Sequence, residues 1–328
     1  MTEKLFDKVA VIGLGLIGSS LARGIKKRGL AATVTGFDGS ADVRTRSRDL
    51  GFCDGIADTV EDAVKDAQLV VLAVPVGAMA AAAQSVAPHL ADGAIVTDVG
   101  SVKAAVVRQV AEALPDHAAF VPGHPVAGTE YSGPEAGFAE LFEGRWCVVT
   151  PCARSTEAAV EKVVALWTAL GSTVETMTPE HHDIVLAITS HIPHLIAYNI
   201  VGTAADLEDV TQSEVIKFSA GGFRDFTRIA ASDPIMWRDV FLNNKEAVLE
   251  VLGRFSEDLA ALQRMIRWDD GQSLQDHFAR TRAIRRSIID AAIRCTKSRT
   301  PGQRAPCPLH LLDPASRHAE RAGTRSRA

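Results

Sequence analysis

The sequence predicts an α/β fold, with an N-terminal doubly wound parallel sheet of the Rossmann type and an all-helical C-terminal domain. A buried-strand pattern, a glycine-rich turn and a helix open the chain in that order. Short apolar strands then alternate with helical segments to about residue 177, as a doubly wound sheet requires. Beyond that point the apolar residues follow only the helical period, to about residue 296.

The first strand, turn and helix carry a dinucleotide-binding fingerprint. Residues 9–13 (VAVIG) predict a buried strand that runs directly into GLGLIG at 13–18, and residues 16–28 predict a helix that Gly29 ends. The first glycine makes a tight turn, the second lets the backbone approach a pyrophosphate, and the third lets the helix pack closely on the strand. The helix N-terminus suits a phosphate. The expected cofactor contacts here are Gly13, Gly15, Leu16, Ile17 and Gly18.

The second strand, residues 33–37, ends at Asp38, which indicates the kind of dinucleotide. An acidic side chain at this place accepts hydrogen bonds from the ribose 2′-OH and repels a 2′-phosphate. NAD is therefore the expected cofactor, and Arg44 and Arg46 lie close enough to keep NADP as the alternative. A glycine-rich turn without a ligand is the weaker interpretation, because the strand, the helix and Asp38 all fit the fingerprint.

The later elements of the first domain place further residues at the ends of strands. The expected strands lie at 69–74, 94–99, 118–121, 146–150 and 172–177, with helices at about 77–87, 104–114 and 156–170. Ligands of open α/β sheets bind at the carboxyl ends of the strands. Gly13, Pro75, Ser101 and His124 should therefore converge on one crevice, where Val74 and Pro75 complete the expected cofactor contacts.

The stretch GHPVAGTE at 123–130 places His124 on a loop punctuated by Gly and Pro, after the strand at 118–121. A nicotinamide accepts a hydride from an alcohol only if a base removes the hydroxyl proton, and an imidazole titrates near neutral pH, where a general base works best. His124 is the candidate base, and Ser101 can hydrogen-bond the hydroxyl or the imidazole. A capping or surface role is the ordinary alternative for a histidine on such a loop.

The helical domain begins at 178–180, where Thr178 is the expected N-cap and Pro179 the first helical residue. His181 and His182 follow in a polar first turn, and we expect them to be solvated. The helix runs to about residue 204 and contains SHIPH at 190–194.

Pro193 should kink this helix and free a backbone carbonyl. His191 and His194 then line a pocket or bond freed carbonyls in the core. A metal pair is the least favoured reading, because no third ligand has suitable spacing.

Further helices start at 232–234 and continue over 236–268, where apolar residues recur at mixed spacings of three and four. These helices carry more apolar faces than one small bundle hides, which predicts a homodimer through the helical domain. We therefore divide the chain into a dinucleotide-binding domain (1–177), a helical substrate and dimerisation domain (178–296) and a tail (297–328). The tail holds six arginines and four prolines without a helical period, and we expect it to be disordered.

Composition argues against several classes of protein. The net charge of −5 gives no basic footprint for nucleic acid, and a nucleic-acid or membrane role of the basic tail is only a minor alternative. Apolar runs such as 69–76 are too short to span a bilayer, and the first residues show no signal-peptide pattern. Five cysteines without a CxxC motif indicate free thiols and no metal site, as in a cytoplasmic protein.

Five motifs together resemble one family, the prephenate/arogenate dehydrogenases (TyrA or cyclohexadienyl dehydrogenases) of tyrosine biosynthesis. These motifs are GLGLIGSSLA at 13–22, DVGSVK at 98–103, GHPVAGTE at 123–130, SHIPH at 190–194 and GGFRDFTRIAASDPIMWRD at 221–239. They occur in the family's order, and the resemblance covers residues 8–296. It implies oxidative decarboxylation of prephenate to 4-hydroxyphenylpyruvate, or of arogenate to tyrosine, with NAD(P).

The resemblance also implies roles for single residues. By motif, His124 resembles the catalytic histidine, Ser101 its hydrogen-bonding neighbour and Arg228 the residue that grips the ring carboxylate. The remaining pocket residues implied in this way are His191, His194, Asp225, Glu130 and Trp237.

The residue types suit this chemistry, since an arginine fork binds a carboxylate in bidentate fashion. Plainer alternatives stay open for three residues. Arg228 would merely pair with Asp225, Glu130 would be a solvated loop carboxylate, and Trp237 would be a core residue.

Two other classes of protein fit the residues less well. A different hydroxyacid dehydrogenase with a Rossmann domain and a helical domain is expected to carry a catalytic lysine on its helices, where only Lys217 and Lys245 are candidates. A noncatalytic NAD-binding protein is expected to have lost His124 or Arg228, and both are present.

Overall fold

The computed structural model describes residues 4–129, 131–207 and 221–297, with side chains described to residue 288. The chain forms two compact units that divide between Gly253 and Arg254. The predicted disordered tail and Glu130 lie outside the described residues.

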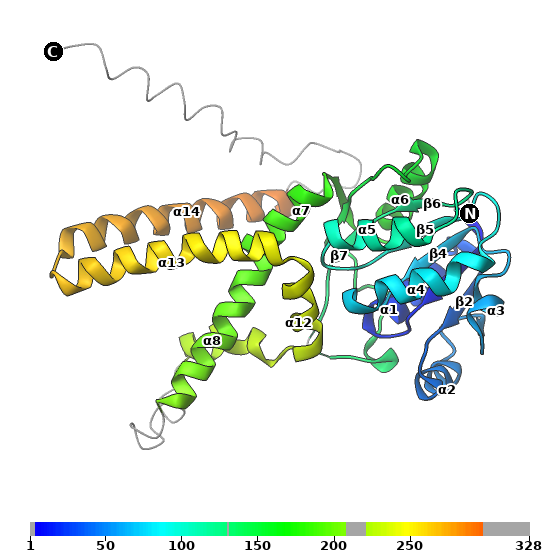
Figure 1. Ribbon diagram of the computed structural model, residues 1–328, viewed down its shortest axis with the longest axis horizontal. Coiled ribbons are helices and arrows are strands. Elements are labelled where there is room, and N and C mark those ends of the chain that lie inside the picture. The colour runs from blue at the N-terminus through cyan, green and yellow to red at the C-terminus, as the bar shows by residue number, and fades with distance from the viewer. Residues whose placement is uncertain (1–3, 130, 208–220, 298–328) are drawn as a thin grey trace, which may run out of the picture. The chain divides into compact units, whose positions relative to one another are not determined.

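The first unit is built on a six-stranded parallel sheet (Figure 1). The strands are β1 (Phe6–Ile12), β2 (Ala31–Phe37), β3 (Gly55–Ile56), β4 (Leu69–Leu72), β5 (Ile95–Asp98) and β6 (Ala119–Val121). Their order is β3-β2-β1-β4-β5-β6, and all neighbouring pairs are parallel. The chain therefore reverses its direction of winding between β1 and β4, which confirms the predicted doubly wound sheet of the Rossmann type.

Helices cover both faces of this sheet. They are α1 (Leu16–Arg28), α2 (Ala41–Leu50), α3 (Val60–Val64), α4 (Met79–Val86), α5 (Ala104–Ala113) and α6 (Glu157–Ala169), with short 3₁₀ turns η1 (Val76–Ala78), η2 (Ala87–His89) and η3 (Pro134–Ala136). Along β1 the buried side chains alternate between two cores: Val9 and Val11 pack with α1 and α6, whereas Ala10 and Ile12 pack with α4 and α5. A strand buried on both faces reads as a continuous apolar run, which is why VAVI was recognisable in the sequence.

A second, three-stranded sheet follows, with strands β7 (Gly123–Val126), β8 (Trp146–Val149) and β9 (Thr173–Thr176). β7 pairs antiparallel with β8, and β9 pairs parallel with β8. The prediction that residues 123–126 belong to a loop was therefore wrong. Pro125 is compatible with this strand because β7 lies at the edge of the sheet, where a missing N–H costs no ladder bond.

A continuous helix of 28 residues, Pro179–Asp206, follows β9. It consists of α7 (Pro179–Leu186), a π-helical turn η4 (Ala187–His191) and α8 (Ile192–Asp206). Thr178 caps it as predicted, since its hydroxyl oxygen accepts from the His181 N–H at 3.2 Å. The π turn ends directly before the Ile192-Pro193 step, where Pro193 lacks the N–H that a regular helix needs.

This helix is long and apolar enough to cross a membrane by length and composition alone, with a hydropathy of 1.5 over an 18-residue window. The apolar runs singled out in the sequence, such as 69–76, are shorter than this helix. The helix also carries buried histidines, and one such helix is weak evidence for a membrane span.

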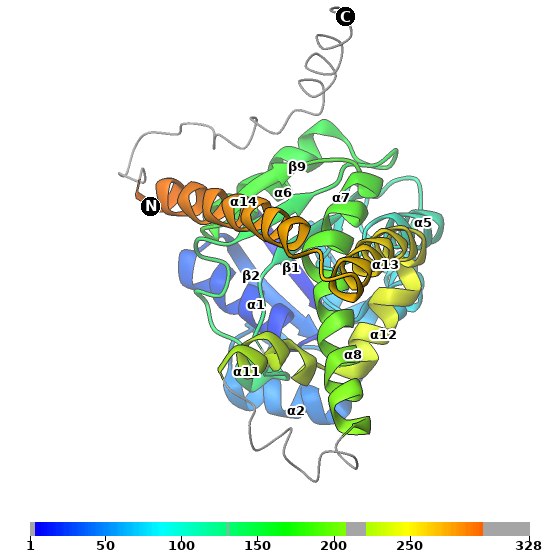
Figure 2. The same cartoon turned by 90° about the vertical axis from the view of Figure 1, so that its left-hand side faces the viewer.

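The remaining described elements are helical, as predicted. They are α11 (Gly221–Thr227), the 3₁₀ turn η5 (Arg228–Ala231), α12 (Pro234–Asn243), α13 (Lys245–Arg267) and α14 (Gly271–Lys297). Asp233 caps α12 by accepting from the Met236 N–H at 2.8 Å. Within the first unit, α11 packs on α8 (Figure 2). The turn η5 also packs on α8, and α12 packs on η1, which follows β4. Within this unit, α12 therefore lies next to the end of β4, where a dinucleotide is expected.

Candidate active site

The three glycines of the turn after β1 differ in the space around them. Gly13 has φ 98°, and a Cβ on it would overlap the carbonyl oxygen of Ala73. A Cβ on Gly18 would overlap the carbonyl oxygen of Gly13, which explains the close approach of α1. A Cβ on Gly15, in contrast, would meet nothing within 4 Å. The backbone at Gly15 is therefore open to a pyrophosphate, as the fingerprint requires.

The other predicted cofactor residues surround this turn. Leu16 and Ile17 open α1, and a Cβ on Gly13 would also contact the side chain of Val74, which precedes the exposed Pro75. The end of β4 therefore lies directly against the glycine-rich turn.

Asp38 ties the end of β2 to the same turn. Its Oδ2 accepts from the Leu14 N–H and its Oδ1 from the Ser40 N–H, both at 2.9 Å. Arg44 donates to the backbone carbonyl of Asp38 at 2.8 Å, and Arg46 is held by Asp42 and by both carboxylate oxygens of Glu135. The carboxylate is thus fixed where a ribose is expected, and Arg46 is already paired.

His124 lies on β7 and belongs to a buried chain of three side chains. Its Nδ1 is 2.8 Å from Nε2 of His182, and Nδ1 of His182 is 2.8 Å from Oδ1 of Asp183. Asp183 also accepts from the backbone N–H groups of Lys103 (2.7 Å) and Ala104 (2.9 Å), at the start of α5. The carboxylate is therefore held rigidly by a helix N-terminus.

The hydrogen bonds from Asp183 through His182 to His124 determine which nitrogen of His124 is basic. An ionised carboxylate only accepts hydrogen bonds, so His182 donates from Nδ1 and accepts at Nε2. His124 must then donate from its own Nδ1, which leaves the lone pair on its Nε2. Nε2 of His124 makes no hydrogen bond with any described residue. The geometry suits a general base whose orientation and tautomer are both fixed.

Burial and neighbouring positive charge both favour the neutral form of this base. Burial is the main cause that holds the pKa of His124 well below its usual range, and His182, Lys103 and His191 add to it. Burial also lowers the pKa of His182, although its bond to Asp183 opposes this. Both imidazoles are therefore neutral at pH 7.

The prediction that His182 is solvated was wrong, because this side chain is 0% exposed. α7 packs against α5, which turns His182 and Asp183 inward while His181 stays exposed. The sequence shows a polar first turn but not the helix that packs on it, and the turn was therefore expected to face solvent. The two adjacent histidines followed by Asp183 were the one feature of the sequence that could have indicated a buried polar cluster.

Ser101 lies between β5 and α5 and is half-buried. Its hydroxyl forms no hydrogen bond with His124 or with any other described residue. Two residues later, Lys103 is fully buried and pairs with Asp98 at the end of β5. Sequence reasoning assigned no role to either member of this pair, although both stand in the DVGSVK motif.

The side chains of His191, His194 and Trp237 lie in contact with one another. The rings of His194 and Trp237 stack with centroids 3.7 Å apart, and Nδ1 of His194 donates to the Ser190 carbonyl at 2.8 Å. His191 is buried, and its Nδ1 accepts from the Asn244 amide at 3.1 Å. Asn244, which the sequence did not single out, also donates to the Asp183 carbonyl at 2.9 Å. The imidazole Nε2 of His191 and the indole N–H of Trp237 are buried and have no hydrogen-bond partner among the described residues.

Arg228 begins η5 and is exposed, and its positive charge contributes, after burial, to a lowered pKa of His194. It therefore lies near the His194–Trp237 stack. An ion pair with Asp225, which is exposed on α11, is absent from the described part of the chain. The alternative that Arg228 merely pairs with Asp225 therefore finds no support in the described residues.

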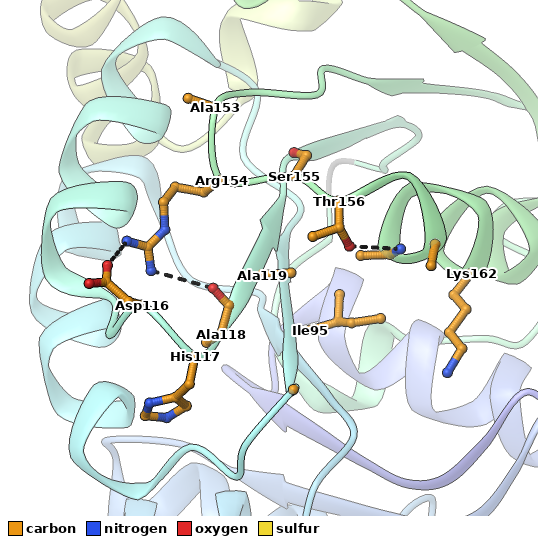
Figure 3. A pocket seen from close by; sticks show the side chains of 13 residues that line it. Ile95, Asp116, His117, Ala118, Ala119, Ala153, Arg154, Ser155, Thr156 and Lys162 are labelled. Carbon is orange, nitrogen blue, oxygen red and sulfur yellow. Dashed lines mark hydrogen bonds and ion pairs between the residues drawn. The ribbon is translucent and has the colours of Figure 1, made fainter.

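A separate hollow of about 440 Å³ lies at the opposite, amino ends of β5 and β6 (Figure 3). Its most prominent charged side chain, Arg154, already donates to Asp116 and to three backbone carbonyls. None of the predicted site residues lines it. We therefore place the chemistry at the carboxyl ends of the strands.

Comparison with known proteins identifies the family of this chain. The family profile described as "Prephenate dehydrogenase, nucleotide-binding domain" matches residues 21–176, and "Prephenate dehydrogenase, dimerization domain" matches residues 178–280. The cyclohexadienyl dehydrogenase of Zymomonas mobilis is 43% identical over 87% of this chain and 97% of its own length. The prephenate dehydrogenase of Bacillus subtilis is 34% identical, over 84% of this chain and 74% of its own.

A solved structure is similar over nearly its whole length. The prephenate dehydrogenase of Aquifex aeolicus, in complex with hydroxyphenyl propionate and NAD+, matches with a TM-score of 0.81 and 33% identity, over 88% of this chain and 99% of the other. Neither of the two rival classes considered from the sequence accounts for these matches. The chain belongs to the prephenate dehydrogenase family.

Proposed function

We propose that this chain catalyses the NAD-dependent oxidative decarboxylation of prephenate, of arogenate or of both, a step of tyrosine biosynthesis. Membership of the family and the names of its relatives support the reaction class. The observation that carries the proposal is the chain of Asp183, His182 and His124. In this arrangement Nε2 of His124 is free, and His124 lies on β7, which directly follows the carboxyl end of β6.

His124 acts as the general base. Its Nε2 accepts the proton of the ring hydroxyl as the hydrogen on the same carbon leaves as a hydride. When bound, the nicotinamide accepts that hydride. The ketone oxygen that forms then accepts, through the ring, the electron pair of the breaking bond to CO₂ and takes back the proton held by His124. CO₂ leaves and the ring becomes an aromatic phenol. Ser101 hydrogen-bonds the hydroxyl, since its own hydroxyl has no partner among the described residues.

Arg228 binds the ring carboxylate through its guanidinium fork. Its exposure, and the lack of an ion pair with Asp225 in the described residues, support this role. Asp225 and Glu130 are assigned to the pocket by motif resemblance alone.

His194 and Trp237 form one wall of the pocket. The two unpartnered buried groups, Nε2 of His191 and the indole N–H of Trp237, support a polar contact with the substrate. Asn244 donates to Nδ1 of His191, and therefore Nε2 of His191 carries the proton and is a donor. Both groups thus suit acceptor oxygens.

The cofactor is held by the turn of Gly13, Gly15 and Gly18 with Leu16 and Ile17, and it is flanked by Val74 and Pro75. Asp38 hydrogen-bonds the ribose 2′-OH, which favours NAD over NADP. The fixed carboxylate of Asp38 and the existing pairing of Arg46 support this preference.

We further propose the domain division at 177 and 296 and a homodimer formed through the helical domain. The dimerization profile covers residues 178–280. Within the second unit, large apolar side chains are exposed on α13, on α14 and between them: Leu259, Ile266, Trp268, Phe278, Ile284 and Ile288. Apolar faces of this extent require a partner, and a second copy covers them in a symmetric dimer. A cytoplasmic location fits such a biosynthetic enzyme.

The test is reduction of NAD by the purified chain, followed by the absorbance of the reduced nicotinamide. Prephenate and arogenate are supplied separately, each with NAD and with NADP. We expect NAD reduction with at least one of the two substrates and loss of it in the His124→Asn variant. Absence of turnover with both substrates and both cofactors would refute the proposed function.

A further inference from the structure

The ion pair of Lys103 and Asp98 takes no part in the proposed chemistry, yet it lies against the base. Both side chains are 0% exposed, and the Lys103 ammonium donates to Oδ2 of Asp98. Asp98 ends β5, and Lys103 precedes α5. A buried charge pair is costly to form, which leaves its presence beside the base to be explained.

Both members of the pair hydrogen-bond the backbone of Gly123, the residue before His124. The Lys103 ammonium donates to the Gly123 carbonyl at 2.7 Å, and Oδ1 of Asp98 accepts from the Gly123 N–H at 3.3 Å. A Cβ at position 123 would come within 3.2 Å of the Asp98 carbonyl oxygen, so a larger residue there would be tightly packed. The backbone that carries His124 is therefore fixed by two charged side chains.

Lys103 reaches the same base by a second route. Its backbone N–H donates to Oδ1 of Asp183, the oxygen that also receives Nδ1–H of His182. One residue thus fixes the strand that bears His124 and the carboxylate that begins the hydrogen-bond chain to it.

We propose that Lys103, paired with Asp98, is a positioning residue that holds His124 in place, and that its ammonium charge opposes a second positive charge on this base. The inference rests on the proposed function in one respect only, the role of His124 as base. Lys103 acts through His124 and does not touch the substrate.

The sign of the electrostatic effect follows from the groups around the base. After burial, the groups that lower the pKa of His124 are His182, the cation Lys103 and His191. The Asp98 carboxylate contacts the backbone of Gly123, and the Asp183 carboxylate contacts His182. A cation at this position disfavours a second positive charge on His124. Removing the Lys103 charge raises the pKa of His124, and removing the Asp98 charge does not raise it. If the pair were merely structural, removing either charge would change the pKa of His124 in the same way.

The experiment is an NMR titration of His124 with selective ¹³C labelling of the histidines. The His124 signal among the ten histidines is assigned by its loss in His124→Asn. The variants are Lys103→Met, Asp98→Asn and the double variant Lys103→Met/Asp98→Asn. Lys27→Met, which removes one half of an exposed ion pair on α1, is the matched control.

We expect the titration of His124 to move to higher pH in Lys103→Met and to stay or move lower in Asp98→Asn. The control should match the unmodified chain. With substrate, kcat of Lys103→Met should fall by about 10-fold or more, a part of the roughly 100- to 10,000-fold that a positioned base supplies. NAD affinity should not change. An unmoved titration in Lys103→Met, or movement in the same direction in both single variants, would overturn the proposal.

Loss of one partner of a buried pair is strongly destabilising. If Lys103→Met does not fold, the double variant carries the test, because it leaves neither charge unpaired. Its His124 should titrate at higher pH than in the unmodified chain, and an unchanged titration contradicts the proposal. The titration needs no turnover. If the unmodified chain fails to oxidise prephenate and arogenate while the titration shifts as expected, the proposed function fails and the role of Lys103 stands.

Discussion

Replacing His182 by leucine tests whether the buried hydrogen-bond chain prepares the base. In the unmodified chain, Nδ1 of His124 donates to Nε2 of His182, and this keeps the lone pair on Nε2 of His124. Leucine fills the same space but cannot accept that hydrogen bond. The proton of His124 is then free to move to Nε2, where it removes the basic lone pair.

The magnitude follows from what is lost. A buried donor left without a partner costs about 1 to 3 kcal/mol, and His182 is 0% exposed. If the wrong tautomer becomes favoured by about 1.4 to 2.7 kcal/mol, kcat falls roughly 10- to 100-fold. The Asp183 carboxylate keeps its bonds to the Lys103 and Ala104 N–H groups, and therefore the helix start should survive.

The assay compares kcat and KM of His182→Leu with two matched variants. His182→Gln restores an acceptor oxygen near Nδ1 of His124 and should recover part of the lost kcat. His181→Ala changes the exposed neighbour and should behave as the unmodified chain. An unaltered kcat in His182→Leu, with the fold intact by circular dichroism, would show that the chain to Asp183 does not prepare the base.

Three further predictions concern the two ligands. Arg228→Ala should raise the substrate KM by orders of magnitude, since an unpaired desolvated carboxylate costs about 2 to 5 kcal/mol, and NAD affinity measured by calorimetry should stay the same; an unchanged KM would remove Arg228 from the pocket. Asp38→Ser should narrow the preference for NAD over NADP, because it removes the charge that repels a 2′-phosphate; equal kcat/KM for both cofactors in the unmodified chain contradicts the role of Asp38. Gly18→Ala should abolish NAD binding or lower the unfolding midpoint, because its Cβ would overlap the Gly13 carbonyl.

Much of the first unit could be predicted because its signals are local. Nearby residues in the sequence determine the strand β1, the end of the helix Leu16–Arg28 at Gly29 and the N-cap at Thr178. The strand β7 could not be predicted, because it forms only by pairing with β8, about twenty residues later, and Pro125 argued against it.

The residues proposed for the site could be singled out from the sequence where they stand in a motif and not where their contacts depend on packing. His124, His194 and Trp237 were found through motifs, and the structure places His194 and Trp237 in contact. His182, Asp183 and Asn244 were missed because their roles arise from contacts between α7, α5 and the start of α13, which no local pattern encodes. Burial also changes the expected pH dependence, since it holds the pKa of His124 below the ordinary histidine range.

The central claim, that His124 is the base, is tested most directly by the pH profile of kcat in His124→Asn. In the unmodified chain His124 is neutral at pH 7, and activity should fall only as the pH drops through its lowered pKa. His124→Asn should lower kcat by roughly 100- to 10,000-fold, leave the binding of NAD and substrate nearly unchanged and abolish this acidic limb. A variant that keeps most of its kcat, or keeps the same acidic limb, would place the base elsewhere, with His191 and His194 the next to be tested.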